Sequence, residues 1–404
     1  MAADLSPPQA SGTLRPRMSD RTLAALAEGR LYLKDGTDHL QRHESDFAQE
    51  ILDRHLRMAQ KHAWKGGGGD EGSMIPRNSL WGRGEGDSTI PIVVSSVAPG
   101  EEGGHVAYLL ETESVGGLLD YELAAKHERR LFHREGFRAG NLDRHPETRK
   151  LVCSVPVPGG GSNLAVIEPD GRDLREATEG DSFDDAPSWI PGEEFTVVFQ
   201  SAGLARSREG QVSGLGPFAI ERLDFRTGEM ETLRSNPQVD FLQPHLDTEG
   251  NLYYIRRPYD GPRGPRPPWT STVKDVLLFP VRLVRALLHF LDAFSRFFSQ
   301  KPLLSAGGPQ QEGPDRNQLW IHGRLLEMKN AEGDEGKSLA PSDWQLIRAT
   351  SEGSETVLAK GVLAYDLAPD GTLAYTNGRH LTLLKDGRKE KVADLSLADT
   401  VKWV

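Results

Sequence analysis

The sequence predicts an all-β fold: a six-bladed β-propeller in which N- and C-terminal strands close one blade, with helical insertions added to the ring. Two observations predict it. An imperfect repeat runs along most of the 404 residues, and one copy of that repeat is divided between the two ends of the chain. Propellers have this organisation because a blade shared by both termini leaves no sheet edge unpaired.

The first element of the repeat is a tight turn followed by a strand. Each copy places Pro, Gly, Asp or Glu in the turn and then β-branched, aromatic and aliphatic residues, which favour strands. The five copies are residues 97–111, 144–155, 189–201, 246–257 and 367–378.

The second element is a hairpin, read as strand, acidic or glycine-containing turn, and strand. Turns such as Pro169-Asp170-Gly171 supply the Asp and Gly that short hairpins need. Five copies follow the five turn-strand elements, and a sixth lies near the N-terminus; they are 118–136, 163–180, 219–235, 344–361, 380–396 and 30–45.

The two ends of the chain complete each other. The hairpin at 30–45 has no turn-strand element before it, and the β-rich segment 398–404 has no hairpin after it. Five complete units and two complementary halves make six blades. We therefore expect 398–404 to pair with the strand around Arg30–Lys34.

The length is consistent with six blades. Six blades of roughly 42 residues need about 250 residues, and the stretches without the blade pattern, 1–20, 46–88 and 258–343, hold 149. We expect a disordered tail at 1–20 and a propeller over 21–404, interrupted by the other two stretches.

Two segments of the repeat resemble a known family. Ala186-Pro187-Ser188-Trp189-Ile190-Pro191-Gly192 and Ala368-Pro369-Asp370-Gly371 are similar to the WD-like repeat of TolB-type β-propellers, Pro-x-Trp-Ser-Pro-Asp-Gly before a strand. The hairpin at 166–178 resembles the partner hairpin of that family. Ser and Asp of the signature are replaced at Ile190 and Gly192. The resemblance covers about 260 residues and implies a six-bladed propeller.

The resemblance implies no catalytic residue, because the Trp, Pro, Asp and Gly of the repeat are packing and turn residues. Periplasmic TolB proteins also have a signal peptide and an N-terminal domain that this sequence does not show, so their location and partner are not transferred.

Composition excludes several classes of protein. Hydrophobic residues make up 37% of the chain and 43 residues are Gly, enough for a globular core. With 48 Lys and Arg against 59 Asp and Glu, the net charge is −11, so we expect no nucleic-acid partner. The single cysteine, Cys153, excludes an intrachain disulfide and a Cys-based zinc site. The first residues form no signal-peptide-like apolar segment, and we expect a cytoplasmic protein.

Several motifs suggest chemistry, and each has a simpler structural interpretation. Ala331–Ser338 fits a loose phosphate-binding loop, but it contains three carboxylates and is followed by Pro341 instead of a helix, so we expect no nucleotide binding. The histidines His39, His43, His55 and His62 lack the spacing of metal ligands, and we expect no metal and no cofactor.

Three aspartates and the cysteine also have simpler structural interpretations. Asp181, Asp184 and Asp185 are hard oxygen donors suited to calcium, but they favour a connecting loop in which Asp side chains hold turns. Cys153 lies within an apolar strand, where a buried, inert thiol is expected. No set of catalytic residues is visible, and an enzyme is the less favoured interpretation.

The insertions are the unusual feature. Residues 46–64 have helical apolar spacing and predict a surface helix. In the larger insertion, a Pro-rich arm at 258–269 precedes an amphipathic helix at 270–304, whose polar residues lie within an arc of about 80°. Five polar groups exclude a spanning helix. The predicted contact residues are Phe279, Arg282, Leu283, Arg285, Leu287, Phe290, Phe294, Arg296 and Phe297.

Three surroundings for the 270–304 helix stay open: a partner protein, the surface of a membrane, or the propeller itself, with the helix as a lid. The sequence thus predicts a non-enzymatic scaffold that binds a protein partner through this helix. The alternative is an enzyme or a small-ligand-binding subunit that uses the central funnel of the propeller.

Overall fold

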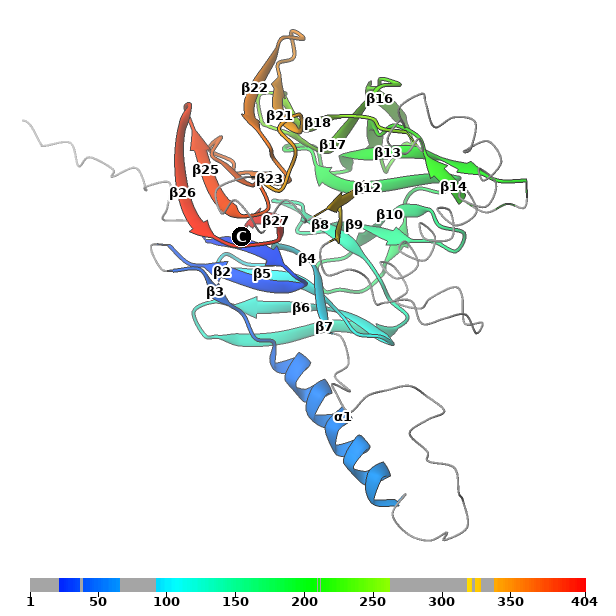
Figure 1. Ribbon diagram of the computed structural model, residues 1–404, viewed down its shortest axis with the longest axis vertical. Helices are drawn as coiled ribbons and strands as arrows, with labels where there is room; N and C mark the ends of the chain where they lie inside the picture. The colour runs from blue at the N-terminus through cyan, green and yellow to red at the C-terminus, as the bar shows by residue number, and fades with distance from the viewer. Residues whose placement is uncertain are drawn as a thin grey trace, which may run out of the picture.

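The computed structural model describes residues 22–36, 39–65, 92–208, 210, 212–261, 318–321, 324–327 and 338–404. Six four-stranded blades are arranged radially around a common axis (Figure 1). Within each blade the strands are antiparallel, and the first strands of successive blades contact one another around the axis. The predicted six-bladed propeller is confirmed.

The strands of blades 1 to 3 are given from the axis outward. Blade 1 contains β27 (Ala398–Trp403), β1 (Leu23–Ala27), β2 (Arg30–Lys34) and β3 (Gln41–Arg42). Blade 2 contains β4 (Val93–Pro99), β5 (His105–Glu111), β6 (Val115–Glu122) and β7 (His127–Glu135). Blade 3 contains β8 (Gly140–Arg144), β9 (Leu151–Pro156), β10 (Ser162–Ile167) and β11 (Arg175–Glu176).

Blades 4 to 6 follow the same order. Blade 4 contains β12 (Ser182–Trp189), β13 (Thr196–Arg206), β15 (Ala219–Asp224) and β16 (Met230–Arg234). Blade 5 contains β17 (Val239–Leu246), β18 (Leu252–Pro258), β21 (Gln345–Ala349) and β22 (Glu355–Lys360). Blade 6 contains β23 (Ala364–Leu367), β24 (Leu373–Thr376), β25 (His380–Lys385) and β26 (Arg388–Asp394).

Blade 1 closes the ring with strands from both ends of the chain, as predicted, but the predicted pairing partner is wrong. The C-terminal strand β27 pairs with β1, Leu23–Ala27, and β1 in turn pairs with Arg30–Lys34. The sequence Leu-Ala-Ala-Leu-Ala has no β-branched or aromatic residue and so lacks a strand signal. Burial decides its conformation, because all five of its residues lie in the core.

Apolar clusters lie between neighbouring blades and form the core. Between blades 2 and 3, for example, Leu109 and Leu118 pack with Leu142, Leu151 and Cys153. Cys153 is fully buried, and burial raises the pKa of its thiol to about 12. It is therefore the inert core thiol that the sequence predicted.

Four described elements lie outside the blades, two of them in one hairpin. The helix α1 (Asp46–Lys65) confirms the surface helix predicted at 46–64. The strand β14 (Val212–Leu215) pairs with the end of the long β13, and β19 (Gln318–Ile321) forms a hairpin with β20 (Arg324–Glu327). Among the described helical residues, none form a segment both long and apolar enough to cross a membrane.

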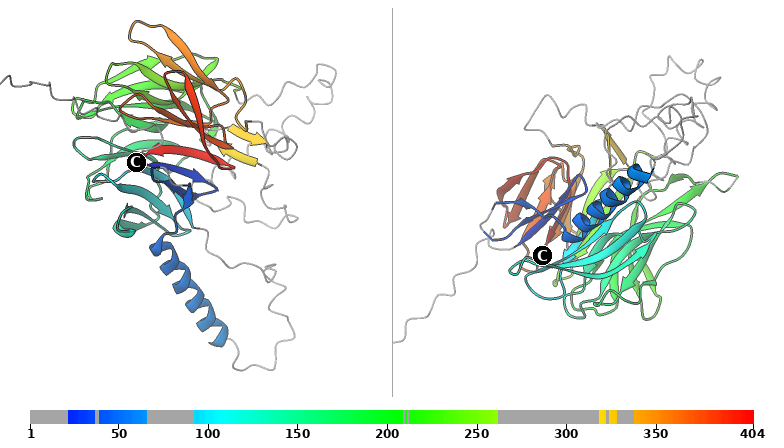
Figure 2. Two further views of the ribbon diagram at one scale, coloured as in Figure 1. Left: turned by 90° about the vertical axis from the view of Figure 1, so that its left-hand side faces the viewer. Right: turned by 90° about the horizontal axis from the view of Figure 1, so that it is seen from below.

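The insertions all leave the ring at one end, which follows from the strand directions. In an antiparallel blade, connections between blades and connections between the second and third strands lie at the same end. α1 is in the connection β3–β4, β14 in the connection β13–β15, and β19 and β20 in the connection β18–β21. We call this the insertion end. The C-terminus and the hairpin β19–β20 (yellow) lie on opposite sides of the ring (Figure 2, left).

Candidate functional site: the polar centre of the ring

The innermost strands place polar residues at one equivalent position. In each blade, it is the residue of the first strand that forms the second-to-last pair with the second strand. A turn follows the last pair in five blades, and the chain ends soon after it in β27. Around the ring the position is occupied by Lys402, Ala98, Asp143, Ser188, His245 and Asp366. Five of the six residues are polar, although the surrounding strands are largely apolar.

Irregular backbone precedes this position in three blades. Asn141, Ala186 and Gln243 have positive φ values of 50°, 48° and 50°, and each lies two residues before the polar position at a β-bulge. Bulges bend a strand and redirect the side chains that follow them. A bulge therefore sets the direction of the polar side chain in each of blades 3, 4 and 5.

Four of these side chains lie in contact and are here called the central cluster: Asp143, His245, Asp366 and Lys402. Lys402 Nζ lies 3.2 Å from Asp143 Oδ1 and 3.3 Å from Asp366 Oδ1. His245 Nε2 lies 3.3 Å from the same Asp366 oxygen. The four side chains are only 9–16% exposed, so the cluster is largely buried.

Lys402 links blades that are not neighbours. It belongs to blade 1 and Asp143 belongs to blade 3, while blade 2 contributes Ala98 at the equivalent position. A methyl side chain at Ala98 leaves room for the ammonium group to reach past blade 2. The central cluster thus joins blades 1, 3, 5 and 6.

The second oxygen of each carboxylate binds the backbone of the next blade. Asp143 Oδ2 accepts a hydrogen bond of 2.9 Å from the Trp189 amide, and Asp366 Oδ2 accepts one of 2.8 Å from the Trp403 amide. Both oxygens of each carboxylate are therefore occupied, one by the ammonium group and the other by a backbone donor.

Electrostatics keep Lys402 and Asp366 of this cluster charged. Burial alone lowers the pKa of Lys402, but the carboxylates of Asp366 and Asp143 outweigh burial and raise it above its ordinary value. Burial raises the pKa of Asp366, yet Lys402 and His245 outweigh it and hold the pKa below its usual range. An ion pair fixed in this way is a structural link and is poorly suited to proton transfer near neutral pH.

A second polar group surrounds Asp185. Its Oδ1 accepts hydrogen bonds from Asn141 Nδ2 at 2.6 Å and from Ser154 Oγ at 2.7 Å, and its Oδ2 lies 3.3 Å from Gln200 Nε2. Gln200 Oε1 accepts a hydrogen bond of 2.8 Å from the Gln243 amide, which extends the group to blade 5. Burial raises the pKa of Asp185, and these hydrogen bonds lower it in part.

Solved structures with a similar fold are found, although no family model and no curated protein matches the sequence. TolB from Acinetobacter baumannii is 12% identical; the match covers 97% of this chain and 68% of that chain, with a TM-score of 0.51. The fold is a TolB-like β-propeller. Weaker matches are a nidogen/laminin complex (7% identity, 95% and 97% coverage, TM-score 0.49) and the tricorn protease (11%, 96% and 36%, 0.46).

The positions of three acidic residues in this TolB-like propeller correct one sequence prediction. Asp184 and Asp185 lie within the innermost strand β12, not in a connecting loop, and Asp184 Oδ1 accepts a hydrogen bond of 2.7 Å from Ser201 Oγ. Asp181 precedes the strand and forms an ion pair with Arg206. The prediction of turn-holding aspartates is therefore wrong for Asp184 and Asp185.

The histidines considered as metal ligands in the sequence are described only in part. His43 Nε2 lies 3.2 Å from the Tyr108 hydroxyl and 3.6 Å from a Glu128 oxygen. The described residues contain no group of three or more His, Cys, Asp or Glu arranged to hold a metal ion. The side chains of His55 and His62 lie outside the described residues.

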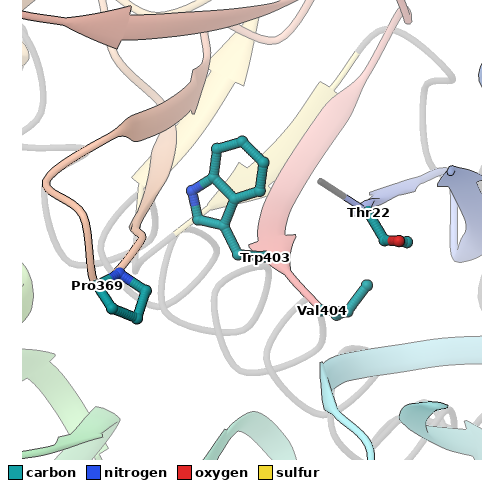
Figure 3. A pocket seen from close by; sticks show the side chains of 4 residues that line it. All are labelled: Thr22, Pro369, Trp403 and Val404. Atoms are coloured by element: carbon teal, nitrogen blue, oxygen red, sulfur yellow. The ribbon is translucent and has the colours of Figure 1, made fainter. Parts of the chain in front are cut away.

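A hollow of about 370 Å³ opens at the end of β27, on the side of the ring opposite the insertion end. Thr22, Pro369, Trp403 and Val404 line it (Figure 3). Pro369 belongs to the turn of blade 6 and the other three residues belong to blade 1. The same β27 strand thus contributes Lys402 to the central cluster and Trp403 to this hollow.

The docking residues predicted from the sequence, which lie between Phe279 and Phe297, are outside the described residues, and so are the tail 1–20 and most of the segment 331–338. The central cluster was not predicted. One signal for it was present, because Asp143, Ser188 and Asp366 each lie three residues before a turn proline, namely Pro146, Pro191 and Pro369. His245 and Lys402 have no such proline.

Proposed function

We propose that this TolB-like propeller is a non-enzymatic scaffold that binds a protein partner at its insertion end, with the segment 270–304 as the main docking element, in the cytoplasm. The observation behind the proposal is the convergence of the three enlarged connections, β3–β4, β13–β15 and β18–β21, at one end of a ring. Connections vary most where a rigid scaffold presents a binding surface.

The central cluster supports a scaffold more than an enzyme. A catalytic carboxylate needs an oxygen free for substrate, metal or a transferred proton. In Asp143 and Asp366 one oxygen faces Lys402 and the other accepts a backbone amide hydrogen bond. These carboxylates hold blades together, which is the work expected of a rigid frame.

The apolar and basic residues of segment 270–304 support its proposed role as the docking element. The segment contains large apolar residues that include Phe290 and Phe294, beside the basic residues Arg282, Arg285 and Arg296. Apolar residues of this size stabilise an interface by roughly 1.5–3 kcal/mol each when fully buried. Such a segment fits the groove of a partner protein as an amphipathic helix.

The test is capture of partners from the native lysate by the full chain and by the double variant Phe290→Asp/Phe294→Asp. We expect the variant to lose the partner while its melting temperature stays at the wild-type value. A matched control, Arg388→Glu/Lys389→Glu on the exposed strand β26, should keep the partner. Retention of every partner by the double variant would refute the docking role.

A vesicle experiment separates a protein partner from a membrane. If 270–304 binds a membrane surface, Arg282, Arg285 and Arg296 would lie at headgroup level, and binding to anionic vesicles would fall with added salt. We expect no binding to anionic or neutral vesicles. Salt-sensitive binding to anionic vesicles that the double variant abolishes would replace the protein partner with a membrane.

A further inference from the structure

His245, the only member of the central cluster from blade 5, has an acceptor beside each of its two ring nitrogens. Nδ1 lies 3.2 Å from the carbonyl oxygen of Gln243, and Nε2 lies 3.3 Å from Asp366 Oδ1. The pKa of Asp366 is held below its usual range by Lys402 and His245, which outweigh burial, so its carboxyl is ionised. A carbonyl oxygen and an ionised carboxylate accept hydrogen bonds and donate none.

A neutral imidazole satisfies only one of these two acceptors. It carries a proton on one nitrogen, and the other nitrogen presents a lone pair. With the proton on Nδ1, the bare Nε2 would face the Asp366 carboxylate, and the side chain of His245 is only 13% exposed to water. Unpaired buried polar atoms are costly. A ring with protons on both nitrogens instead donates to Gln243 and attracts Asp366, although Nε2 and the carboxylate are not aligned as a hydrogen bond.

The charges of the central cluster favour the same state. Asp143 and Asp366 contribute two negative charges, and the ammonium group that lies between them, on Lys402, contributes one positive charge. A second proton on His245 makes the cluster neutral, whereas a neutral imidazole leaves one negative charge uncompensated in a largely buried place, which is unfavourable. Burial and the Lys402 ammonium both oppose a charged imidazole. The two carboxylates and the two acceptor contacts oppose these effects.

The tyrosines near His245 leave this charge count unchanged. Tyr365 of β23 packs on the imidazole, with 5.1 Å between ring centroids, and its hydroxyl donates a hydrogen bond of 2.7 Å to the Gln243 carbonyl. Burial raises the pKa of Tyr365 well above its ordinary value, so its hydroxyl stays neutral. Tyr253 of β18 lies opposite His245 in the sheet, and burial raises the pKa of its hydroxyl as well.

The strand β12 of blade 4 brings a carboxyl group closer to β17. Asp185 Oδ2 lies 3.3 Å from Gln200 Nε2, and Gln200 Oε1 accepts a hydrogen bond from the Gln243 amide. Burial raises the pKa of Asp185, which favours its uncharged form. The polar position of β12 itself is occupied by Ser188, which carries no charge. The carboxylates that decide the state of His245 are therefore those of the central cluster.

We propose that His245 is a proton-operated link in the ring: with two protons it joins blade 5 to the central cluster, and loss of one proton releases blade 5 from the cluster. The unfolded chain does not hold the two acceptors beside this ring, so folding takes up a proton. The stability that the doubly protonated ring contributes is therefore present at acidic pH and is lost as the pH rises. This link is independent of the proposed function, since it uses no residue of the insertion end.

The first test is urea unfolding of wild type and His245→Gln between about pH 5 and about pH 8, the range in which histidines titrate. Glutamine keeps a polar side chain but cannot take up a proton. We expect the ratio of the folding constants, wild type over variant, to fall by about tenfold or more across this range. His127→Gln, on the exposed part of β7, should keep a constant ratio to wild type. A constant or rising ratio for His245→Gln would overturn the proposal.

Nitrogen NMR of the histidine side chains tests the same link in the wild-type chain, whether or not the variant folds. His145 is the internal reference. Its Nδ1 accepts hydrogen bonds from the Glu147 and Thr148 amides at 3.0 and 3.1 Å, and its Nε2 lies 3.2 Å from the Glu193 carbonyl oxygen, an arrangement that only a neutral ring satisfies. At about pH 7 we expect two protonated nitrogens in His245 and one in His145. A bare nitrogen in His245 at this pH would refute the proposed link.

Discussion

At the scale of single residues, Lys402 connects three blades, because its one ammonium group pairs with carboxylates from two other blades. Replacing it by methionine would keep most of its volume and leave Asp143 and Asp366 buried without their cation. Removing one member of a buried ion pair costs about 3–5 kcal/mol. We expect Lys402→Met to lower the free energy of unfolding by about that amount in urea titrations.

A surface pair provides the matched control. Lys385 Nζ lies 2.8 Å from Asp370 Oδ2, and these side chains are 32% and 37% exposed. Exposed pairs contribute about 0–1 kcal/mol, so Lys385→Met should change stability little. Equal losses in both variants would show that the central cluster is not a structural link.

Asp399 in β27 predicts a pH dependence. Burial raises the pKa of this carboxyl to about 6, and the hydrogen bond from Thr400 lowers it only in part. Between the unfolded pKa of about 4 and the folded value, the folded state binds more protons than the unfolded state. The stability that the protonated Asp399 carboxyl contributes to the folded state is therefore fully present below about pH 4 and is lost as the pH rises through about 6.

The measurement is the urea midpoint of wild type and Asp399→Asn across this range. We expect the variant to gain stability relative to wild type as the pH rises from about 4 to 7. Asp386→Asn, in an exposed turn, should follow wild type throughout. A constant difference between Asp399→Asn and wild type would show that Asp399 ionises alike in the folded and unfolded chains.

Contacts between individual residues were the feature that the sequence predicted least well. Cys153 could be assigned to the core because its apolar neighbours are continuous in sequence. The central cluster could not, because Asp143, His245, Asp366 and Lys402 come from four blades and meet only once the ring has closed. A pairwise distance between such residues is not encoded in the spacing of any one segment.

At the scale of elements, the closing strand β27 connects the two ends of the chain. It pairs with β1 along five residues and contributes Val401 and Trp403 to the core between blades 6 and 1. Removing residues 397–404 would open a sheet edge and delete Lys402 as well. We expect a loss of several kcal/mol and a lower melting temperature, since a whole buried strand is lost.

A second truncation controls for the mere shortening of the chain. Removing residues 1–20, which precede β1, should leave the melting temperature unchanged. If the chain without 397–404 also melted like wild type, β27 would not be needed to hold the ring closed.

The elements themselves were largely predictable. Turn residues and alternating apolar residues recur in each blade, so most strands and the helix α1 have local signals. The exceptions are β1 and the innermost strands β4, β8, β12, β17 and β23, which the predicted turn–strand and hairpin elements do not include. The Leu and Ala residues of β1 become a strand only through pairing with β2 and β27. Tertiary burial overrides local preference there.

At the scale of the whole molecule, the ring is separable from its largest insertion but not from the segment that contains α1. β18 and β21 pair directly, with Ile255 opposite Leu346 and Arg256 opposite Gln345, although the connection between these strands spans residues 259–344. The blade is therefore complete without the insertion. α1 differs, because its first turn packs on β7 and its cap uses Glu128.

This difference predicts opposite results for two deletions. Replacing residues 262–337 by a linker of about ten glycine and serine residues shortens a closed loop, and loop-closure entropy then stabilises the ring by at most about 2 kcal/mol. Replacing residues 46–91 in the same way removes Phe47 from its packing and leaves Glu128 buried without its helix, so the melting temperature should fall. Differential scanning calorimetry measures both changes. A large loss of stability in the first variant would mean that the 258–343 insertion is part of the frame of the ring, and partner loss on its deletion could then no longer be assigned to docking.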